Sequence, residues 1–536
     1  MVWSEHSEVQ RGLVDRRTFL RFSAVAGVLL GASVSACGVE TASDGLGKRL
    51  VLRQLGEMAN LDPAFAVGQP DYEVMVSVYE GLVAYRPGTM DSAPAIAEEL
   101  EINDDRTRIR FRVRPGVQFH AGYGEVTAED VKFSFERIAG VGGHNLDSPY
   151  ARDWAPLERV RVSGRYTGEI RLKEPFAPLF RTTLPLFSGY LLSKRATTER
   201  KDRYATNPIG TGPYEFVEWK PRQHALLRRF EDYSGANSAY APPVVWDEIE
   251  IRGISNDNSA AIGLTTGELD YGAIAPIDAP RLRGDDGFAV DRHAAFDYTF
   301  IGMNQKHEKL RDKRVRQAIR AAIDVDSIIA AGFEGAYDRA TAIIPPTMGV
   351  GHWKDAPLRQ PDPEKARELM AQAGATDTTF TLTAATDQEA SEVVLQVVQA
   401  NLRDAGITSQ ISMQEPGAFY TLGGKTQADR EIFYAGFNGL PDPFYSTVWF
   451  TCDQIGKWNF QNYCDKTFDR MNDRAARTFD EDERDRLYVT MQQRWDDACN
   501  TVWVTWLTMT YAGNDVVAPS IGNDGRMLPW DFRKQA

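Results

Sequence analysis

Apolar and polar residues alternate strictly over residues 108–114, where the sequence reads RIRFRVR. A period of two is typical of a β-strand with one buried face, and Pro115-Gly116 would end that strand. A stripe of arginines is also compatible with nucleic-acid binding, but one solvated face of an antiparallel sheet explains this stripe better. The first regular structure is expected earlier, at residues 49–52.

Helices are predicted where apolar residues recur every three or four positions. One such stripe consists of Val315, Ala318, Ile319, Ala322 and Ile323, and a second consists of Val394, Val397, Val398, Leu402 and Ala405. Gly406 is a natural stop for the second helix. Thr127 and Asp362 are the expected N-caps of two further helices, because acidic residues follow each of them in the first turn. Short strands alternate with these helices, so the fold is α/β or α+β with mixed sheets.

The N-terminal region carries a different pattern. A pair of arginines, Arg16-Arg17, precedes a short and diluted apolar run that ends at Cys37. Only 15 residues separate Arg21 from Cys37, whereas a membrane-spanning helix needs about 20 apolar residues. A charged segment, a short apolar segment and small residues before a cleavage point are typical of an export signal.

Two motifs specify this signal further. RRTFLR at residues 16–21 resembles the twin-arginine export motif, and VSAC at residues 34–37 resembles a bacterial lipobox. We therefore expect a twin-arginine lipoprotein signal peptide over residues 1–36, lipidation of Cys37 and a flexible tether over residues 37–47. The protein would be exported, and its lipid anchor would hold it in the periplasm or on the outer face of the bacterial cytoplasmic membrane.

Composition narrows the functional classes. A chain of 536 residues is too long for one hydrophobic core, so two or three domains are expected. The content of 43% hydrophobic and 25% charged residues is ordinary for a globular protein. The formal net charge of -14 makes nucleic acid an unfavourable partner, because affinity for nucleic acid comes mainly from neutralising phosphates.

Three cysteines lie in the C-terminal part of the chain. Cys452 and Cys464 flank a polar, aromatic segment, and outside the cytoplasm a disulfide between them is expected. Zinc is the weaker alternative, because no CxxC motif or nearby histidine supports it. Cys499 lies between Trp495 and Trp503 on a helical pattern and is expected to be a buried, inert thiol.

A search for catalytic chemistry finds no G-x-S-x-G elbow, no H-E-x-x-H motif and no Walker loop. GTGPY at residues 210–214 lacks the third glycine of a dinucleotide site. The histidines show no metal-ligand spacing; they are His6, His120, His144, His224, His293, His307 and His352. The sequence therefore predicts no catalytic residue, no cofactor and no metal site, and the chain is not expected to be an enzyme.

Several blocks of the sequence resemble, in family order, the extracytoplasmic solute-binding proteins of family 5, which serve ABC importers of peptides and nickel chelates. The blocks are LDP at 61–63, VYEGLV at 78–83, PAIAE at 94–98, FRVRPGVQFHAG at 111–122, VTAEDVKFSFERI at 126–138, NPIGTGPY at 207–214 and MNQKHEKLRDKRVRQAIRAAID at 303–324. The resemblance covers nearly all of the chain that follows the signal peptide.

This resemblance implies a type II periplasmic-binding-protein-like α/β fold, with three lobes, mixed sheets and a ligand cleft that closes by a hinge. Lobe I would consist of residues 48–82, 207–297 and 509–536. Lobe II would be residues 83–206, and lobe III would be residues 298–508. The ligand would lie between lobes I and III.

The resemblance also implies a ligand-binding segment. GFNGLPDP at residues 436–443 is similar to the segment where peptide-binding members place an aromatic residue and then an aspartate for the ligand's amino group. Phe437 has the aromatic place, whereas Leu440 has the place of the aspartate. Asp442 is either a substitute for that aspartate or part of a structural turn. Further expected ligand contacts are Glu57, Tyr298, Asn304 and Asn438.

The spacing of Cys452 and Cys464 resembles a disulfide loop of dipeptide-binding members. The implied function is that of a monomeric, substrate-binding lipoprotein that captures a peptide or peptide-like polar solute and delivers it to ABC permease subunits. Binding of an opine, an oligosaccharide or a nickel chelate by the same fold is the alternative. An exported hydrolase and an adhesion or signalling lipoprotein remain further alternatives, although a hydrolase needs a nucleophile with a base or a metal site.

Overall fold

The computed structural model describes residues 48–66, 68–86, 89–235, 244–284, 287–386, 388, 390–420 and 429–535. The predicted signal peptide, the tether and Cys37 lie outside these residues, so export and lipidation stay predictions. Within the described ranges, no helix combines the length and the apolar character needed to cross a membrane.

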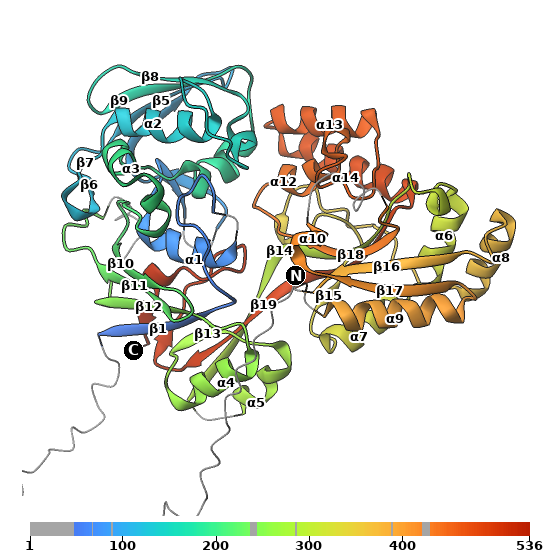
Figure 1. The fold of residues 1–536 in the computed structure, drawn as a ribbon. Coiled ribbons are helices and arrows are strands. Elements are labelled where there is room, and N and C mark those ends of the chain that lie inside the picture. The colour runs from blue at the N-terminus through green and yellow to red at the C-terminus, as the bar shows by residue number, and fades with distance from the viewer. Residues whose placement is uncertain are drawn as a thin grey trace, which may run out of the picture. The chain divides into compact units, whose positions relative to one another are not determined.

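A large mixed sheet forms the centre of the structure (Figure 1). Its strands are, in spatial order, β10 (Tyr214–Lys220), β11 (His224–Arg229), β12 (Glu248–Gly253), β1 (Arg49–Gln54), β13 (Tyr271–Ala273), β19 (Thr501–Asn514), β14 (Phe288–Met303), β18 (Ile432–Phe437), β16 (Thr379–Ala385) and β17 (Thr408–Gln414), with β15 (Asp338–Arg339) paired to β19. β1 pairs in parallel with β12 and β13, whereas β14 pairs antiparallel with β18 and β19. The prediction of mixed sheets is confirmed.

Two long strands, β14 and β19, connect the two sides of this sheet. Residues 288–294 of β14 pair with residues 508–514 of β19, and residues 298–302 pair with residues 501–506. The register shifts between Ala294 and Tyr298, and such a bulge bends the strand that carries it. We call residues 48–294 together with 508–535 the first half, and residues 298–506 the second half. The boundaries of the three predicted lobes stay a prediction.

The first half carries a second, antiparallel sheet. Its strands are, in spatial order, β4 (Ala97–Ile102), β5 (Arg108–Val113), β9 (Thr167–Leu172) and β8 (Leu157–Val162). The apolar residues of β5 are buried and its arginines are exposed, as the alternating pattern predicts. α2 (Ala128–Ala139) packs against β8 and begins directly after Thr127, whose backbone N–H donates to Asp130 Oδ2 at 3.0 Å.

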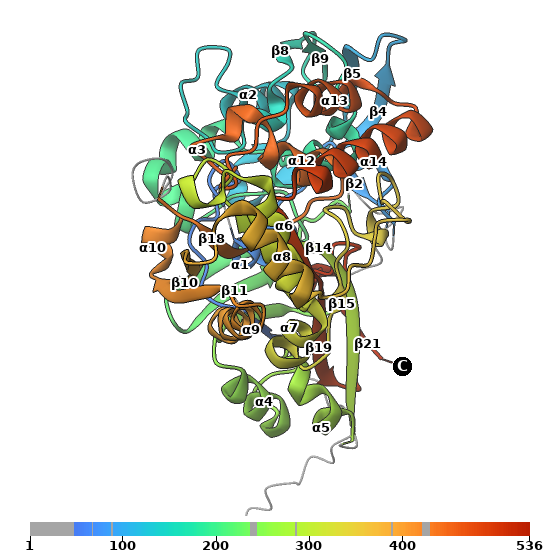
Figure 2. The ribbon, with the colours of Figure 1, turned by 90° about the vertical axis from the view of Figure 1, so that its right-hand side faces the viewer.

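Four helices cover β16–β18 in the second half: α6 (Lys313–Ala322), α7 (Val325–Phe333), α8 (Pro363–Ala373) and α9 (Ser391–Asp404). The residues of both predicted stripes pack in one core, and α6 and α8 lie side by side (Figure 2). Asp362 Oδ1 accepts from the Lys365 N–H at 2.9 Å, which confirms the predicted cap. α9 ends at Asp404, with Ala405 as its C-cap, and Gly406 follows at a φ of 75°, so the predicted glycine stop is confirmed.

Three further helices lie between β18 and β19 along the chain: α12 (Phe444–Thr447), α13 (Lys466–Arg477) and α14 (Glu481–Ala498). The disulfide between Cys452 and Cys464 is present, with a Cα–Cα distance of 4.6 Å, and that prediction is confirmed. Cys499 is a buried, free thiol that lies just after α14 rather than within it. Burial raises the pKa of this thiol, which fits an inert group.

The remaining elements are shorter or peripheral. They are α1 (Gln69–Val78), α3 (Lys194–Arg200), α4 (Asp257–Thr266), α5 (Ala279–Arg283), α10 (Pro416–Phe419), β2 (Val83–Tyr85), β3 (Ser92–Pro94), β6 (Gln118–Phe119), β7 (Gly124–Glu125), β20 (Val517–Ala518) and β21 (Arg533–Lys534). α1 carries an unusual buried acid, Glu73, which is 1% exposed. Glu73 Oε1 accepts from Gln69 Nε2 at 2.9 Å, whereas Oε2 has no hydrogen-bond partner among the described residues. Burial raises the pKa of Glu73 to about 7.

The Glu73→Gln variant should change how stability depends on pH. Between pH 4.5 and 7 the unfolded chain loses the Glu73 proton while the folded chain keeps it, so the contribution of Glu73 to the free energy of unfolding falls by about 1.4 kcal/mol per pH unit. Glutamine removes this penalty, and the variant should gain up to about 3 kcal/mol over the wild type as pH rises to 7, with no further gain above it. Urea denaturation at pH 5, 6, 7 and 8 measures the difference. Glu308→Gln, at an exposed glutamate, is the control, and parallel stability curves for Glu73→Gln and the wild type would contradict the prediction.

Candidate functional site

Strand pairing brings two of the predicted ligand contacts together. Tyr298 on β14 lies opposite Phe437 on β18, and their ring centroids are 6.2 Å apart in an edge-to-face arrangement. Tyr298 is fully buried, its hydroxyl donates to the Ser446 carbonyl at 3.1 Å, and burial raises its pKa. Phe437 is partly exposed. Phe437 therefore exposes part of its ring, while the buried Tyr298 packs against it, and both stay predictions as ligand contacts.

Two tryptophans extend the exposed aromatic surface around Phe437. The ring centroid of Phe437 lies 6.1 Å from that of Trp449 and 6.4 Å from that of Trp458, and the two tryptophans are 5.9 Å apart. All three side chains are partly exposed. We call Phe437, Trp449 and Trp458 the aromatic wall. Neither tryptophan was predicted as a site residue, although the density of aromatic residues between positions 444 and 460 could have indicated an aromatic site.

The loop after β18 is fixed to the bulge of β14. A Cβ atom on Gly439 would lie 2.3 Å from the Phe296 carbonyl oxygen, so only glycine fits there. The Gly439 N–H donates to Asp297 Oδ1 at 2.9 Å, and Asp297 lies 3.8 Å from the guanidinium of Arg526. Burial raises the pKa of Asp297, while Arg526 and the Gly439 N–H oppose the rise. These contacts hold the exposed Asn438 beside the aromatic wall.

Asn304 and Glu57 lie elsewhere. Asn304 is buried beyond the end of β14, where its Nδ2 donates to the Arg430 carbonyl and its Oδ1 accepts from Asn462 Nδ2, each at 3.0 Å. Glu57 is exposed on the loop after β1, where its Oε1 would lie 2.9 Å from a Cβ atom built on Gly253. The two partners named for Asn304 lie outside the aromatic wall. As ligand contacts, both stay predictions.

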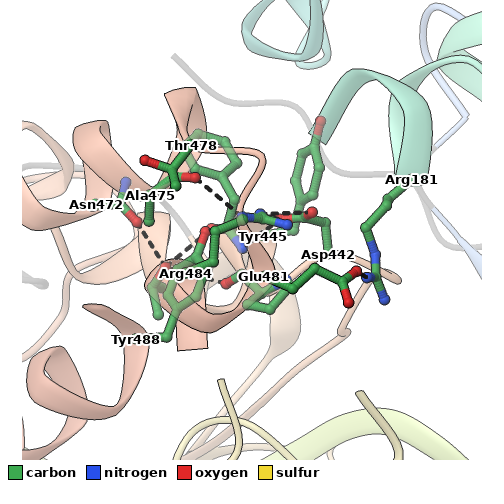
Figure 3. A network of polar contacts seen from close by, with 12 residues as sticks. Arg181, Asp442, Tyr445, Asn472, Ala475, Thr478, Glu481, Arg484 and Tyr488 are labelled. Carbon is green, nitrogen blue, oxygen red and sulfur yellow. Dashed lines mark hydrogen bonds and ion pairs between the residues drawn. The ribbon is translucent and has the colours of Figure 1, made fainter. Parts of the chain in front are cut away.

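Asp442 is fully buried and forms an ion pair within the second half (Figure 3). Nη2 of Arg484 donates to both carboxylate oxygens at 2.7 and 2.8 Å, and the Phe444 N–H donates to Oδ1 at 3.0 Å. Burial lowers the pKa of Arg484, but the charge of Asp442 and the neighbouring Tyr488 outweigh this effect and raise it. These partners neutralise the buried carboxylate of Asp442 and satisfy its hydrogen bonding, which gives it a structural role. Its role as a ligand contact stays a prediction.

Residues 174–183 of the first half contact helices α12–α14 of the second half, and we call these contacts the seam. Its polar pairs are Glu174–Arg477 at 3.0 Å, Ala177–Ala476 at 2.7 Å, Arg181–Glu481 at 3.2 Å and Thr183–Tyr445 at 3.2 Å. Figure 3 shows Arg181 directed toward Glu481. Exposed ion pairs of this kind contribute only about 0–1 kcal/mol each. The two ion pairs therefore add little to the seam, which also holds the buried Thr183–Tyr445 hydrogen bond and the ring contact of Phe176 with Phe444.

The described ranges hold no group of three or more histidine, cysteine or acidic side chains that could bind a metal ion.

Residues 92–457 match the family model for bacterial extracellular solute-binding proteins, family 5. This match confirms the prediction that the chain is not an enzyme. The match covers the β5 strand, the α6 stripe, Phe437 and Trp449, and it ends one residue before Trp458.

Full-length relatives and solved structures extend this finding. Di/tripeptide-binding protein 1 of Pseudomonas aeruginosa is 28% identical over 510 residues, which cover 89% of this chain and 91% of the relative. The structure of the ABC transporter-associated periplasmic binding protein DppA from Helicobacter pylori, in complex with the peptide STSA, has a TM-score of 0.79 at 24% identity and covers 91% of this chain and 98% of that chain. The structure of AgaA from A. tumefaciens R10, in complex with agropinic acid, has a TM-score of 0.76 at 22% identity and covers 91% and 99%. These similarities confirm the predicted fold class, an α/β periplasmic-binding-protein fold.

The Asp442→Asn variant should be strongly destabilised without any ligand. Removing one partner of a buried ion pair leaves an uncompensated charge on Arg484, which costs about 3–5 kcal/mol. The double variant Asp442→Leu/Arg484→Met should recover most of this loss, because it replaces both charges by apolar side chains. Asp482→Asn, at an exposed aspartate of α14, is the matched control. Urea denaturation measures all four proteins, and a wild-type stability for Asp442→Asn would leave the structural role without support.

Proposed function

Because the chain belongs to family 5 of the bacterial extracellular solute-binding proteins, we propose that it captures a peptide or peptide-like polar solute outside the cytoplasm and delivers it to the permease of an ABC importer. The observation that carries this proposal is the aromatic wall, which presents three partly exposed rings beside the exposed Asn438. Flat rings bind the apolar parts of a solute, and a nearby amide pairs with its polar groups.

We propose that the solute binds between the two halves, which close around it. The halves correspond approximately to predicted lobes I with II and to predicted lobe III. β14 and β19 would act as the hinge, because they are the long strands that pass from one half to the other and because β14 changes register at residues 295–297. Phe437 and Asn438 would contact the solute directly, whereas Tyr298 would support the aromatic wall from its buried position.

The location follows from the same proposal. A binding protein that serves a permease has to remain near the membrane, and a lipid at Cys37 followed by the tether of residues 37–47 would keep it there. One acyl chain alone anchors a protein only moderately. The lipid would thus hold the proposed lipoprotein near the permease, and stable attachment would need a second membrane contact.

An opine is the second candidate ligand, and one observation favours it. In this chain Leu440 has the place of the aspartate that holds a peptide's amino group in the similar segment of peptide-binding members, and Asp442 is paired with Arg484. A buried ammonium needs a paired carboxylate, so recognition of a free amino terminus is less well supported than recognition of the rest of a peptide.

A thermal-shift screen tests the proposal. Dipeptides, tripeptides and agropinic acid are added to the purified protein, and binding ligands should raise the Tm, because a ligand at 100 times its Kd stabilises the folded state by about 2.7 kcal/mol. Phe437→Ala should reduce this shift for every ligand, since it removes the central ring of the aromatic wall. Phe216→Ala, at a partly exposed aromatic residue of β10 in the first half, should keep the full shift. Unchanged Tm values for the wild type with all of these compounds would refute the proposed function.

A further inference from the structure

Arg152 extends from the first half to the aromatic wall of the second half. It belongs to η2 (Ala151–Trp154), and its guanidinium carbon lies 4.6 Å from the ring centroid of Trp449. Its Nη2 donates to Gln454 Oε1 at 3.5 Å, across 302 positions of sequence. This arginine therefore stacks on one ring of the aromatic wall, at the place where the two halves meet.

Two hydrogen-bond donors at this contact lack partners. Arg152 Nη1 and Trp449 Nε1 are both buried, and neither has a hydrogen-bond partner in the part of the chain that the structure describes. A buried donor without an acceptor costs about 1–3 kcal/mol, and the cost is larger for a charged group. Two such donors on stacked side chains therefore indicate that an acceptor binds to them.

The neighbouring carboxylates are already engaged with other groups. Asp153 is buried and accepts from the Ser188 hydroxyl. Asp453 accepts from the Thr451 hydroxyl and from Gln454 Nε2. Among the described residues, the guanidinium of Arg152 thus has a stacking partner and one long hydrogen bond, but no ion pair. An acceptor that carries a negative charge would satisfy both its hydrogen bonding and its charge.

We propose that Arg152 and Trp449 form a binding site for a carboxylate group of the transported solute. The inference rests on the proposed function and specifies the chemistry of its ligand. A carboxylate accepts charge-assisted hydrogen bonds from a guanidinium and has a further lone pair for the indole N–H. The apolar part of the solute would then lie against Phe437 and Trp458. The carboxylate belongs either to the C-terminus of a short peptide or to an opine.

This site also couples binding to closure. Arg152 and Trp449 lie in different halves, so a carboxylate bound to both makes contacts that exist only when the halves are together. A ligand shifts a conformational equilibrium by its difference in affinity for the two states. Solutes that lack the carboxylate would bind the aromatic wall alone and would favour closure less.

Titration calorimetry with three probes tests the site: Ala-Ala-Ala, the C-terminal amide of Ala-Ala-Ala, and agropinic acid. The wild type should bind the acid form of the tripeptide at least about tenfold more tightly than the amide, a difference of about 1.4 kcal/mol. Arg152→Gln should lose this preference, because it binds the acid as weakly as the wild type binds the amide. Trp449→Phe keeps the ring but removes the N–H, and it should lose part of the preference.

Arg181→Gln is the matched control, because Arg181 also extends from the first half and pairs with Glu481 across the seam. It should change the affinities for acid and amide by the same factor. If only agropinic acid binds, loss of its binding in Arg152→Gln assigns the site to an opine carboxylate. Equal wild-type affinity for acid and amide, or an equal loss of both in Arg152→Gln, would overturn the carboxylate site and leave the proposed function intact. Failure of all three probes to bind the wild type would overturn both.

Discussion

The antiparallel pairing of β14 with β19 is the constraint on which the rest of the structure depends. This ladder includes residues 288–294 and 298–302 of β14, and every other strand of the large sheet is attached on one side of it or the other. The bulge at residues 295–297 is where the ladder changes register, and Asp297 binds the Gly439 N–H at that point. The position of Phe437 and Asn438 is therefore set by the same backbone that joins the two halves.

The contacts across the seam differ in kind from the ladder. A ladder of backbone hydrogen bonds is cooperative and buried, whereas the seam consists largely of individual side-chain pairs, several of them exposed. Exposed ion pairs have small net energies, but the seam also holds the buried Thr183–Tyr445 hydrogen bond and the Phe176–Phe444 ring contact. Under the proposed function, the halves would close about β14 and β19, and a ligand that touches both halves would supply the difference in affinity that such a motion needs.

The sequence predicts the structure best where neighbouring residues alone determine a strand, a helix or a cap. The alternation of β5, the stripes of α6 and α9 and the cap at Asp362 depend on neighbouring residues, and each is found as expected. The partner of Asp442 lies 42 positions away, and Arg152 contacts a residue 302 positions away. No local period encodes such pairs, because they arise only when the sheet brings distant segments together. Tyr298 and Phe437 were named separately through the family resemblance, and their pairing across β14 and β18 was not predicted.

The two charged groups near the aromatic wall suggest how ligand recognition is divided in this chain. Asp442 is held by Arg484 in the interior of the second half, so its charge serves the fold. Arg152 has no ion pair among the described residues and faces a ring of the aromatic wall. The carboxylate of Asp442 is therefore paired, whereas the guanidinium of Arg152 interacts with the charge of Asp153 without forming an ion pair in the described part of the chain. Under the proposed function, the protein distinguishes solutes by their acidic end, and the amino end contributes little to affinity.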